Sequence, residues 1–154
     1  MSNLQIQEYS RHMLYILYNK NTYHTYNGYT VCFDKRLRQH NCELAGGANF
    51  TSRLVKSKQI AWLPVALIRV PNEDFDQRRA LSLEWSVHYP DNRRPRPAKF
   101  NGATGRLQGL ALVFNNSKFA DLSFNVQVFT QTHYDVLTSA LKEKSKDRVT
   151  VELM

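Results

Sequence analysis

Apolar side chains in the first half of the chain follow the pattern of β-strands. Residues 13–18 (MLYILY) place apolar groups on both faces of an extended chain, which predicts a buried strand. After a turn at residues 19–21, residues 22–30 are rich in Thr and Tyr and predict the returning strand of a hairpin. Asn27-Gly28 is itself a strong turn dipeptide. We keep the strand, because a turn there would leave only short stubs on either side.

A further strand is predicted by the near-continuous apolar run at residues 62–70 (WLPVALIRV), which suits a strand buried on both sides. Pro64 restricts this strand to an early or edge pairing position, because proline has no N–H to donate. Helical spacing is seen in residues 31–41, where Phe33 and Leu37 recur four apart. Residues 75–89 predict the clearest helix, a mostly buried cylinder with Asp74 before it as the N-cap.

The remaining segments have weaker patterns. We expect a frayed arm or short helix at residues 2–12, loops at 43–58 and 90–99, helices at 103–114 and 133–141, a strand at 122–130, and a loose charged tail over the last dozen residues.

Charge is distributed unevenly along these 154 residues, whose formal net charge is +8. Residues 11–69 hold nine Lys or Arg against two acids, residues 71–92 hold two against five acids, and residues 93–106 hold five bases without an acid. A basic protein with one acidic island suits a polyanion-binding surface with a metal or acid site, although plain solubility gives the same balance. The length suits one domain.

The two cysteines, Cys32 and Cys42, lack CxxC spacing and are interpreted as reduced thiols of an intracellular protein, in nucleus or cytoplasm. A zinc site would need His24 or His40 to join them, which we do not favour. No segment approaches the roughly 18 apolar residues of a membrane span, and no signal peptide is visible, so we expect no membrane partner.

Glu84 is the most informative single residue, because a glutamate inside an apolar helix is costly to bury as an ion without a partner. One interpretation is a salt bridge to Arg78 or Arg79, or a carboxylate on a solvated rim. The other is a metal ligand, since one carboxylate with waters and substrate phosphate commonly holds Mg²⁺.

Arg36 and His40 stand four residues apart and therefore on one helix face, with Arg38 between them in the sequence. They suit either a solvated basic face or a guanidinium aimed at phosphate beside a titratable imidazole. Tyr15 and Tyr26 lie on predicted strands, where tyrosine is common and often only packs in the core.

Taken together, these residues resemble the GIY-YIG endonuclease superfamily. The runs YNGYTVCFDKRLRQHN, GGANFT and LSLEWSVHYP are similar to its SLX-like branch in particular, and the resemblance covers roughly residues 14–90. The order that carries it is Tyr15, Tyr26-Asn27-Gly28, Arg36, His40-Asn41, Gly46-Gly47-Ala48 and Glu84-Trp85.

The resemblance implies an α/β (α+β) fold with a small central antiparallel β-sheet flanked by helices. It implies phosphodiester hydrolysis of DNA, dependent on Mg²⁺ (or Mn²⁺). The catalytic residues that it implies are Tyr15, Tyr26, Arg36, His40 and Glu84.

In these implied roles Glu84 is the metal ligand, which supplies a Lewis acid at the phosphate. Arg36 stabilises charge on the phosphate oxygens. Tyr15 is the expected proton acceptor for the attacking water, with nearby cations and His40 favouring its proton-accepting form. Tyr26 positions water or phosphate.

This sequence departs from the family pattern at Met13, Leu14 and Asn27, which replace the Gly and Ile of the first motif and the Ile of the second. It also has WSVHYP in place of the branch's WAWQHP, so no role is carried over to His88. Two cysteines cannot build the RING-like module of eukaryotic SLX-type nucleases. Stand-alone copies of this kind occur in bacteria and large DNA viruses.

We therefore expect a nuclease core at residues 1–90 with a C-terminal extension at 91–154 in the same domain, acting on branched or flapped duplex DNA. The alternatives are a catalytically degenerate nucleic-acid-binding or assembly module, and RNA as substrate. Basic residues expected to track phosphates are Arg38, Arg53, Lys56, Lys58, Arg93, Arg94 and Arg96.

Overall fold

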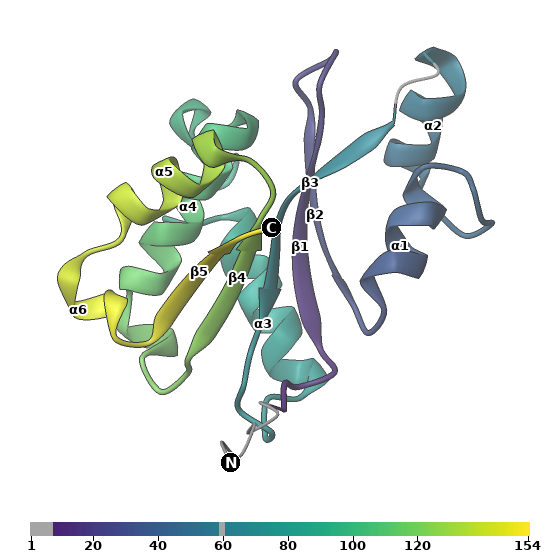
Figure 1. Cartoon of the computed structure of the whole chain (residues 1–154). Helices are drawn as coiled ribbons and strands as arrows, with labels where there is room; N and C mark the ends of the chain where they lie inside the picture. The colour runs from purple at the N-terminus through teal and green to yellow at the C-terminus, as the bar shows by residue number, and fades with distance from the viewer. Residues whose placement is uncertain (1–7, 59–60) are drawn as a thin grey trace.

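The computed structural model describes residues 8–58 and 61–154, so most of the arm expected at residues 2–12 lies outside the described residues. One five-stranded sheet in the order β2-β1-β3-β4-β5 runs through the molecule (Figure 1). Its strands are β1 (Met13–Asn19), β2 (Thr25–Thr30), β3 (Trp62–Arg69), β4 (Phe124–Val128) and β5 (Val149–Leu153).

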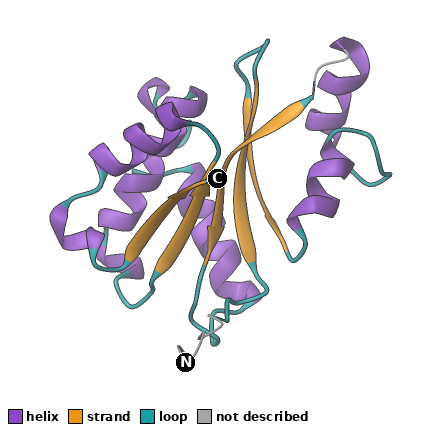
Figure 2. Ribbon diagram, viewed as in Figure 1, coloured by secondary structure: helices purple, strands orange, loops and turns teal. Residues whose placement is uncertain are grey.

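Helices flank this sheet in the described part of the chain (Figure 2). They are α1 (Phe33–His40), α2 (Asn49–Lys58), α3 (Gln77–His88), α4 (Gly102–Asn115), α5 (Gln131–Ala140) and α6 (Glu143–Lys146), with 3₁₀ turns η1 (Ala98–Phe100) and η2 (Ser117–Phe119). The predicted α+β class, a small sheet flanked by helices, is confirmed.

The two faces of the sheet are covered by different helices. On one face Tyr15, Leu17 and Trp62 pack with apolar side chains of α1 and α2. On the other face Leu14 and Ile16 join the larger core, which α3, α4 and α5 complete. Alternation of side chains along β1 produces this division, since successive residues point to opposite faces. Figure 1 shows α1 and α2 standing apart from α4, α5 and α6 across the sheet.

The predicted hairpin and the central strand are present. Asn27 and Gly28 lie within β2, paired with Ile16 and Tyr15, so the turn signal of this dipeptide is overridden by strand pairing. Pro64 lies in β3 beside a register shift opposite β1, and β4 pairs with β3 only from Ala66 onward. Pro64 therefore lies in a part of β3 that β4 does not reach, so no N–H is needed from it to pair with β4.

The loop expected at residues 43–58 is wrong for its second half, which forms α2. Leu54 and Val55 pack against the cluster around Tyr15, and Trp62 donates its indole N–H to the Thr51 carbonyl at 3.1 Å. These contacts to β1 and β3 stabilise a helix whose local sequence gives a weak signal. The bases Arg53 and Lys56 thus belong to a helix and not to a basic loop.

The loose tail expected at the C-terminus is also wrong. Its residues form α6 and β5, and β5 pairs in parallel with β4, so the sheet is not purely antiparallel. Val149 is buried in this pairing. Alternation in residues 149–153 (VTVEL) suits a strand, but its partner is fixed only by tertiary structure.

Helix α3 differs in two respects from the predicted one. It begins at Gln77, with Asp76 as the N-cap accepting from the Arg79 amide at 2.9 Å, because Asp74 lies too far ahead of the first turn. It is not a mostly buried cylinder either, since Leu81 and Trp85 are 46% and 38% exposed. One side of α3 therefore presents apolar side chains to solvent.

Candidate active site

The site is built on the β1–β2 hairpin, whose register places Tyr15 opposite Gly28. The Tyr15 side chain is only 1% exposed, and its ring lies directly over the backbone of β2. A Cβ atom at position 28 would be 2.3 Å from the Tyr15 hydroxyl oxygen. Any side chain there would displace the phenol, so the second motif needs glycine at this position for close approach.

A chain of hydrogen bonds fixes the protonation of His40. The Thr51 hydroxyl donates to the Ala48 carbonyl at 3.0 Å and lies 2.6 Å from His40 Nδ1. Because its single proton is already used, Thr51 must accept from Nδ1–H. His40 Nε2 is then a free lone pair, and it accepts from the Tyr15 hydroxyl at 2.7 Å. Tyr15, His40 and Thr51 therefore form a chain of hydrogen bonds with a defined direction.

Arg36, on α1, joins Tyr15 and His40 on the same face of the sheet. Its Nε donates to the Tyr15 oxygen at 3.3 Å, and Nη1 donates to the Gly46 carbonyl at 2.9 Å and to the Gln39 side chain at 3.0 Å. Within residues 8–58 and 61–154 no hydrogen bond engages Nη2, which leaves donors available for an anion. The Gly46-Gly47 loop thus orients the guanidinium.

Burial sets the charge state of this pair. It raises the pKa of Tyr15 to about 12, although Arg36 acts in the opposite direction. Burial, helped by the positive charge of Arg36, lowers the pKa of His40 to about 4. At neutral pH the phenol is protonated and the imidazole is neutral. Arg36 lowers the pKa of Tyr15, as expected of a nearby cation, but desolvation outweighs this effect, so the phenol stays protonated in the isolated protein.

Tyr26 lies beside the same pair. Its ring centroid is 4.9 Å from that of His40 and 6.4 Å from that of Tyr15. Unlike Tyr15, it is only partly buried. The structure therefore brings four of the five predicted residues, Tyr15, Tyr26, Arg36 and His40, into one cluster on the α1 side of the sheet.

Glu84 reaches the same region from the opposite side. It lies on α3, which packs against the other face of the hairpin, and the Asn27 side-chain amide donates to the Glu84 carbonyl at 3.4 Å. Its negative charge contributes to the raised pKa of Tyr15, so the two side chains are electrostatic neighbours. The predicted site is thus arranged around β2, which is one of the two edge strands of the sheet.

The Glu84 carboxylate forms no ion pair with any described residue, and Arg79 instead pairs with Asp121 at 2.6 Å. Burial raises the pKa of this carboxyl. It lines a cleft of about 260 Å³ with Asn27, Leu81, Trp85, His88 and Tyr89. A half-buried carboxylate without a cation, open to a cleft, fits the single-carboxylate mode of Mg²⁺ binding.

Within the described residues, no cluster of three or more His, Cys, Asp and Glu exists that could hold a metal ion. Cys32 and Cys42 are free and exposed. A closed structural zinc site needs four such ligands, and the described side chains do not supply it.

Asn27, Arg106 and His88 form a hydrogen-bonded group near Glu84 that sequence reasoning missed. Asn27 Oδ1 accepts from the Arg106 guanidinium and from His88 Nδ1, the latter at 2.8 Å. Arg106 on α4 is 2% exposed and also donates to the Val87 and His88 carbonyls at 3.4 and 3.5 Å. These carbonyls form the C-terminal end of α3, where the helix dipole favours a cation.

The departure at Asn27 therefore has a structural reason: it provides an acceptor for a buried arginine that has no carboxylate partner among the described residues. Burial lowers the pKa of Arg106 to about 9. Asn27 and Arg106 are 79 residues apart. Two polar residues at otherwise apolar positions are the signal that could have suggested this pair.

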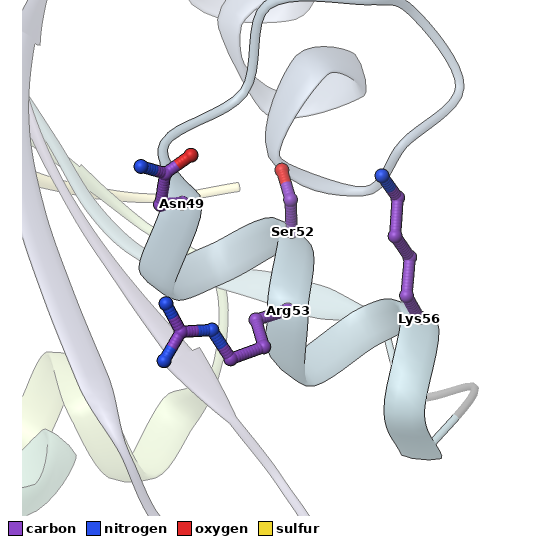
Figure 3. Close-up of a pocket in the computed structure, with 4 residues that line it drawn as sticks. All are labelled: Asn49, Ser52, Arg53 and Lys56. Carbon is purple, nitrogen blue, oxygen red and sulfur yellow. The ribbon is translucent and has the colours of Figure 1, made fainter.

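The basic residues expected to contact phosphate lie in two separate places. Arg53 and Lys56, with Asn49 and Ser52, line an open cleft of about 440 Å³ along α2 (Figure 3). Arg38 on α1 pairs with Glu43 at 3.3 Å, and both are exposed. The side chain of Lys58 lies outside the described residues.

The second basic segment follows α3. Arg93 lies 3.6 Å from Asp91, and Arg94 stacks over the Trp85 ring. Arg96 donates to Asn101 at 2.8 Å and to the His88 carbonyl at 3.2 Å. Arg94 and Arg96 therefore contact residues that line the Glu84 cleft, whereas Arg53 and Lys56 lie on α2, which packs beside α1.

The model of the GIY-YIG catalytic domain matches residues 11–96, more than half of the chain and a region that holds all five predicted catalytic residues. Comparison with curated proteins gives no match. None of the helices formed by residues 8–58 and 61–154 has both the length and the apolar character of a membrane span. A GIY-YIG domain implies an endonuclease, a hydrolase with a DNA substrate, and such nucleases generally depend on a divalent metal. The chain belongs to the GIY-YIG family.

Proposed function

We propose that this protein is an Mg²⁺- or Mn²⁺-dependent endonuclease of the SLX-like type that cuts branched or flapped DNA. The observation that carries the proposal is the directed hydrogen-bond chain from Tyr15 through His40 to Thr51, with Arg36 on the Tyr15 oxygen. Such a chain can move a proton away from an attacking water, which is what phosphodiester hydrolysis needs. We keep residues 1–90 as the nuclease core and 91–154 as its extension.

Glu84 would hold the metal, together with water and the substrate phosphate. When bound, the ion supplies a Lewis acid that polarises the phosphate and stabilises the leaving oxygen. The residues present fit this role, because the Glu84 carboxylate faces a cleft and lacks a cation among the described residues.

The proton path follows from the tautomer of His40. As water attacks phosphorus in line, its proton passes to the Tyr15 oxygen while the Tyr15 proton passes to His40 Nε2. His40 keeps its Nδ1 proton, which it donates to the Thr51 oxygen, and becomes an imidazolium. Tyr15 is never ionised in this concerted transfer, so its pKa of about 12 is no obstacle.

Substrate binding favours this transfer. Arg36 is one of the two causes that lower the pKa of His40. A phosphate bound to the guanidinium offsets its positive charge and so makes His40 a better base. The same contact stabilises charge that develops on the non-bridging oxygens. Tyr26, next to His40, orients the water or the phosphate.

Selectivity for branched DNA is supported by the SLX-like sequence runs and by the two separate basic regions. One lies along α2, which packs on the α1 side of the sheet, and the other follows α3, which packs on the opposite face. A branched duplex offers phosphates in two directions, and each basic region can track one arm.

The test is cleavage of a 5′-labelled flap duplex with millimolar Mg²⁺ or Mn²⁺. We expect Glu84→Gln and Arg36→Ala to abolish nicking while DNA binding survives. Glu73→Gln and Lys35→Ala, which change exposed residues near each site in the sequence, serve as matched controls and should cleave normally. Unchanged cleavage in both site variants would refute the assignment.

A second candidate function is a non-catalytic DNA-binding module. The replacements at Met13 and Asn27 and the near-complete burial of Tyr15 favour it. It predicts that the purified protein shifts flap DNA but leaves it intact with either metal. An RNA flap in the same assay identifies RNA as the substrate if it alone is cut.

A further inference from the structure

Helix α3 carries an exposed apolar ridge beside the Glu84 carboxylate. The ridge consists of Leu81 and Trp85, which are four residues apart on one side of the helix, and of the partly buried Tyr89, which caps the C-terminal end of the helix. Leu81 is 46% exposed and Trp85 is 38% exposed. The Trp85 and Tyr89 rings lie 5.3 Å apart. Trp85 is thus partly open to solvent on the rim of the cleft, where a bound group can reach its ring.

The ridge and the carboxylate face the same space. Leu81, Trp85 and Tyr89 line the cleft of about 260 Å³ into which Glu84 and His88 also open. A group bound in this cleft therefore lies near both aromatic rings and the Glu84 carboxylate.

The charge around the ridge is positive. The Arg94 guanidinium carbon lies 5.6 Å from the Trp85 ring centroid and 5.8 Å from that of Tyr89. Arg96 is anchored to the His88 carbonyl at the same end of α3. An apolar protein partner would have to bury these cations beside its own apolar groups, which is costly. A nucleobase brings a flat ring for the ridge and a phosphate for the arginines.

We propose that Trp85, with Leu81 and Tyr89, is a stacking platform for one unpaired base next to the scissile phosphate. This inference rests on the proposed nuclease function and narrows its substrate class to DNA that is single-stranded at the cut. A base inside a duplex is stacked on both faces and cannot lie on Trp85, whereas a base at a flap or junction can.

Two predictions separate this platform from general DNA binding. Trp85→Ala should weaken binding of a flapped duplex about 10-fold to 100-fold, the range for loss of one base–aromatic stack. It should leave binding of a blunt duplex within about twofold, because phosphate contacts alone hold that substrate. Leu112→Ala, which removes a similarly exposed apolar side chain from α4, is the matched control and should leave both affinities unchanged.

The chain contains two tryptophans, and Trp62 is 1% exposed, so quenching by DNA reports on Trp85. In EDTA, which prevents cleavage, a flapped duplex should quench tryptophan fluorescence and a blunt duplex should not. Trp85→Phe should remove the quenching and retain the circular dichroism spectrum of the parent.

Equal quenching by both substrates, or unchanged flap affinity in Trp85→Ala, would overturn the inference. Failure of the proposed nuclease function gives a different result from failure of the platform. If the parent protein quenches with flap DNA but never cleaves it, the platform stands and the nuclease assignment falls. If it cleaves flaps and Trp85→Ala does so equally well, the nuclease stands and the platform falls.

Discussion

His40 is a buried imidazole with both ring nitrogens engaged, and its uncharged form carries the proposed chemistry. The same burial has a consequence for stability. The folded-state pKa of about 4 lies below the unfolded value of 6.5, so between these values the unfolded chain binds more protons. The contribution of His40 to stability is therefore complete above pH 6.5 and is lost as the pH falls toward 4.

We expect the free energy of unfolding to fall by about 1 kcal/mol through His40 alone between about pH 7.5 and about pH 5.5. Urea unfolding of the parent and of His40→Asn at both pH values measures the difference. His88 and His133 act with the same sign and are present in both proteins, so His40→Asn keeps part of the pH dependence and the parent, with His40 as well, shows the larger one. His24→Asn, which changes an exposed histidine, is the control and should behave like the parent. Equal pH dependence in parent and His40→Asn would contradict the tautomer and burial argument.

Local sequence patterns predict the elements that carry most of the candidate site. The β1–β2 hairpin and α1 are built from contacts between residues close in sequence, and their apolar periods are visible in the chain. The cluster of Tyr15, Tyr26, Arg36 and His40 follows from that hairpin and helix. Glu84 was placed by resemblance, and the side of the sheet from which it approaches was not foreseeable.

The elements that were missed depend on distant partners. Helix α2 has few apolar residues and follows a Gly-Gly loop, so its sequence alone favours a loop; contacts of Leu54 and Val55 with the sheet stabilise it. Strand β5 has a charged neighbourhood and gains its pairing from β4, which lies more than 20 residues earlier. Thr51, the residue that fixes the tautomer of His40, lies on α2 and was missed together with it.

At the scale of elements, Asn27 and Arg106 connect β2, the end of α3, and α4. Asn27→Ile restores the apolar residue of the family motif but removes the acceptor of a buried guanidinium. We expect it to destabilise the fold by roughly 1–3 kcal/mol, the cost of leaving a buried polar group without its partner. Chemical denaturation of the two proteins measures the change. Asn21→Ile, at an exposed position of the hairpin turn, is the control; if Asn27→Ile is as stable as the parent, Asn27 does not hold Arg106.

At the scale of the whole molecule, a net charge of +8 and two basic regions predict DNA binding that weakens steeply with salt. Each phosphate contact contributes about 0.9 to the slope of log affinity against log salt concentration. Arg53→Ala with Lys56→Ala should therefore lower the magnitude of the slope by about 2. Fluorescence anisotropy of labelled flap DNA over a salt series measures it.

Lys142→Ala with Lys144→Ala, which removes the same charge from exposed positions near α6, distinguishes specific contacts from net charge. The slope of this control should stay at the parental value. Equal reductions in both double variants would show that α2 has no special role in holding phosphates.

Arg106 lies outside the matched region 11–96, yet it donates to the middle residue of the second motif. In evolutionary terms we expect the two positions to be inherited as a pair. A lineage that exchanges either residue alone passes through an ancestor with an unsatisfied buried group, so the two substitutions should be linked in descent. Joint occurrence of Asn and Arg at these positions would then mark a lineage within the family, one defined by a contact between the catalytic domain and the segment that follows it.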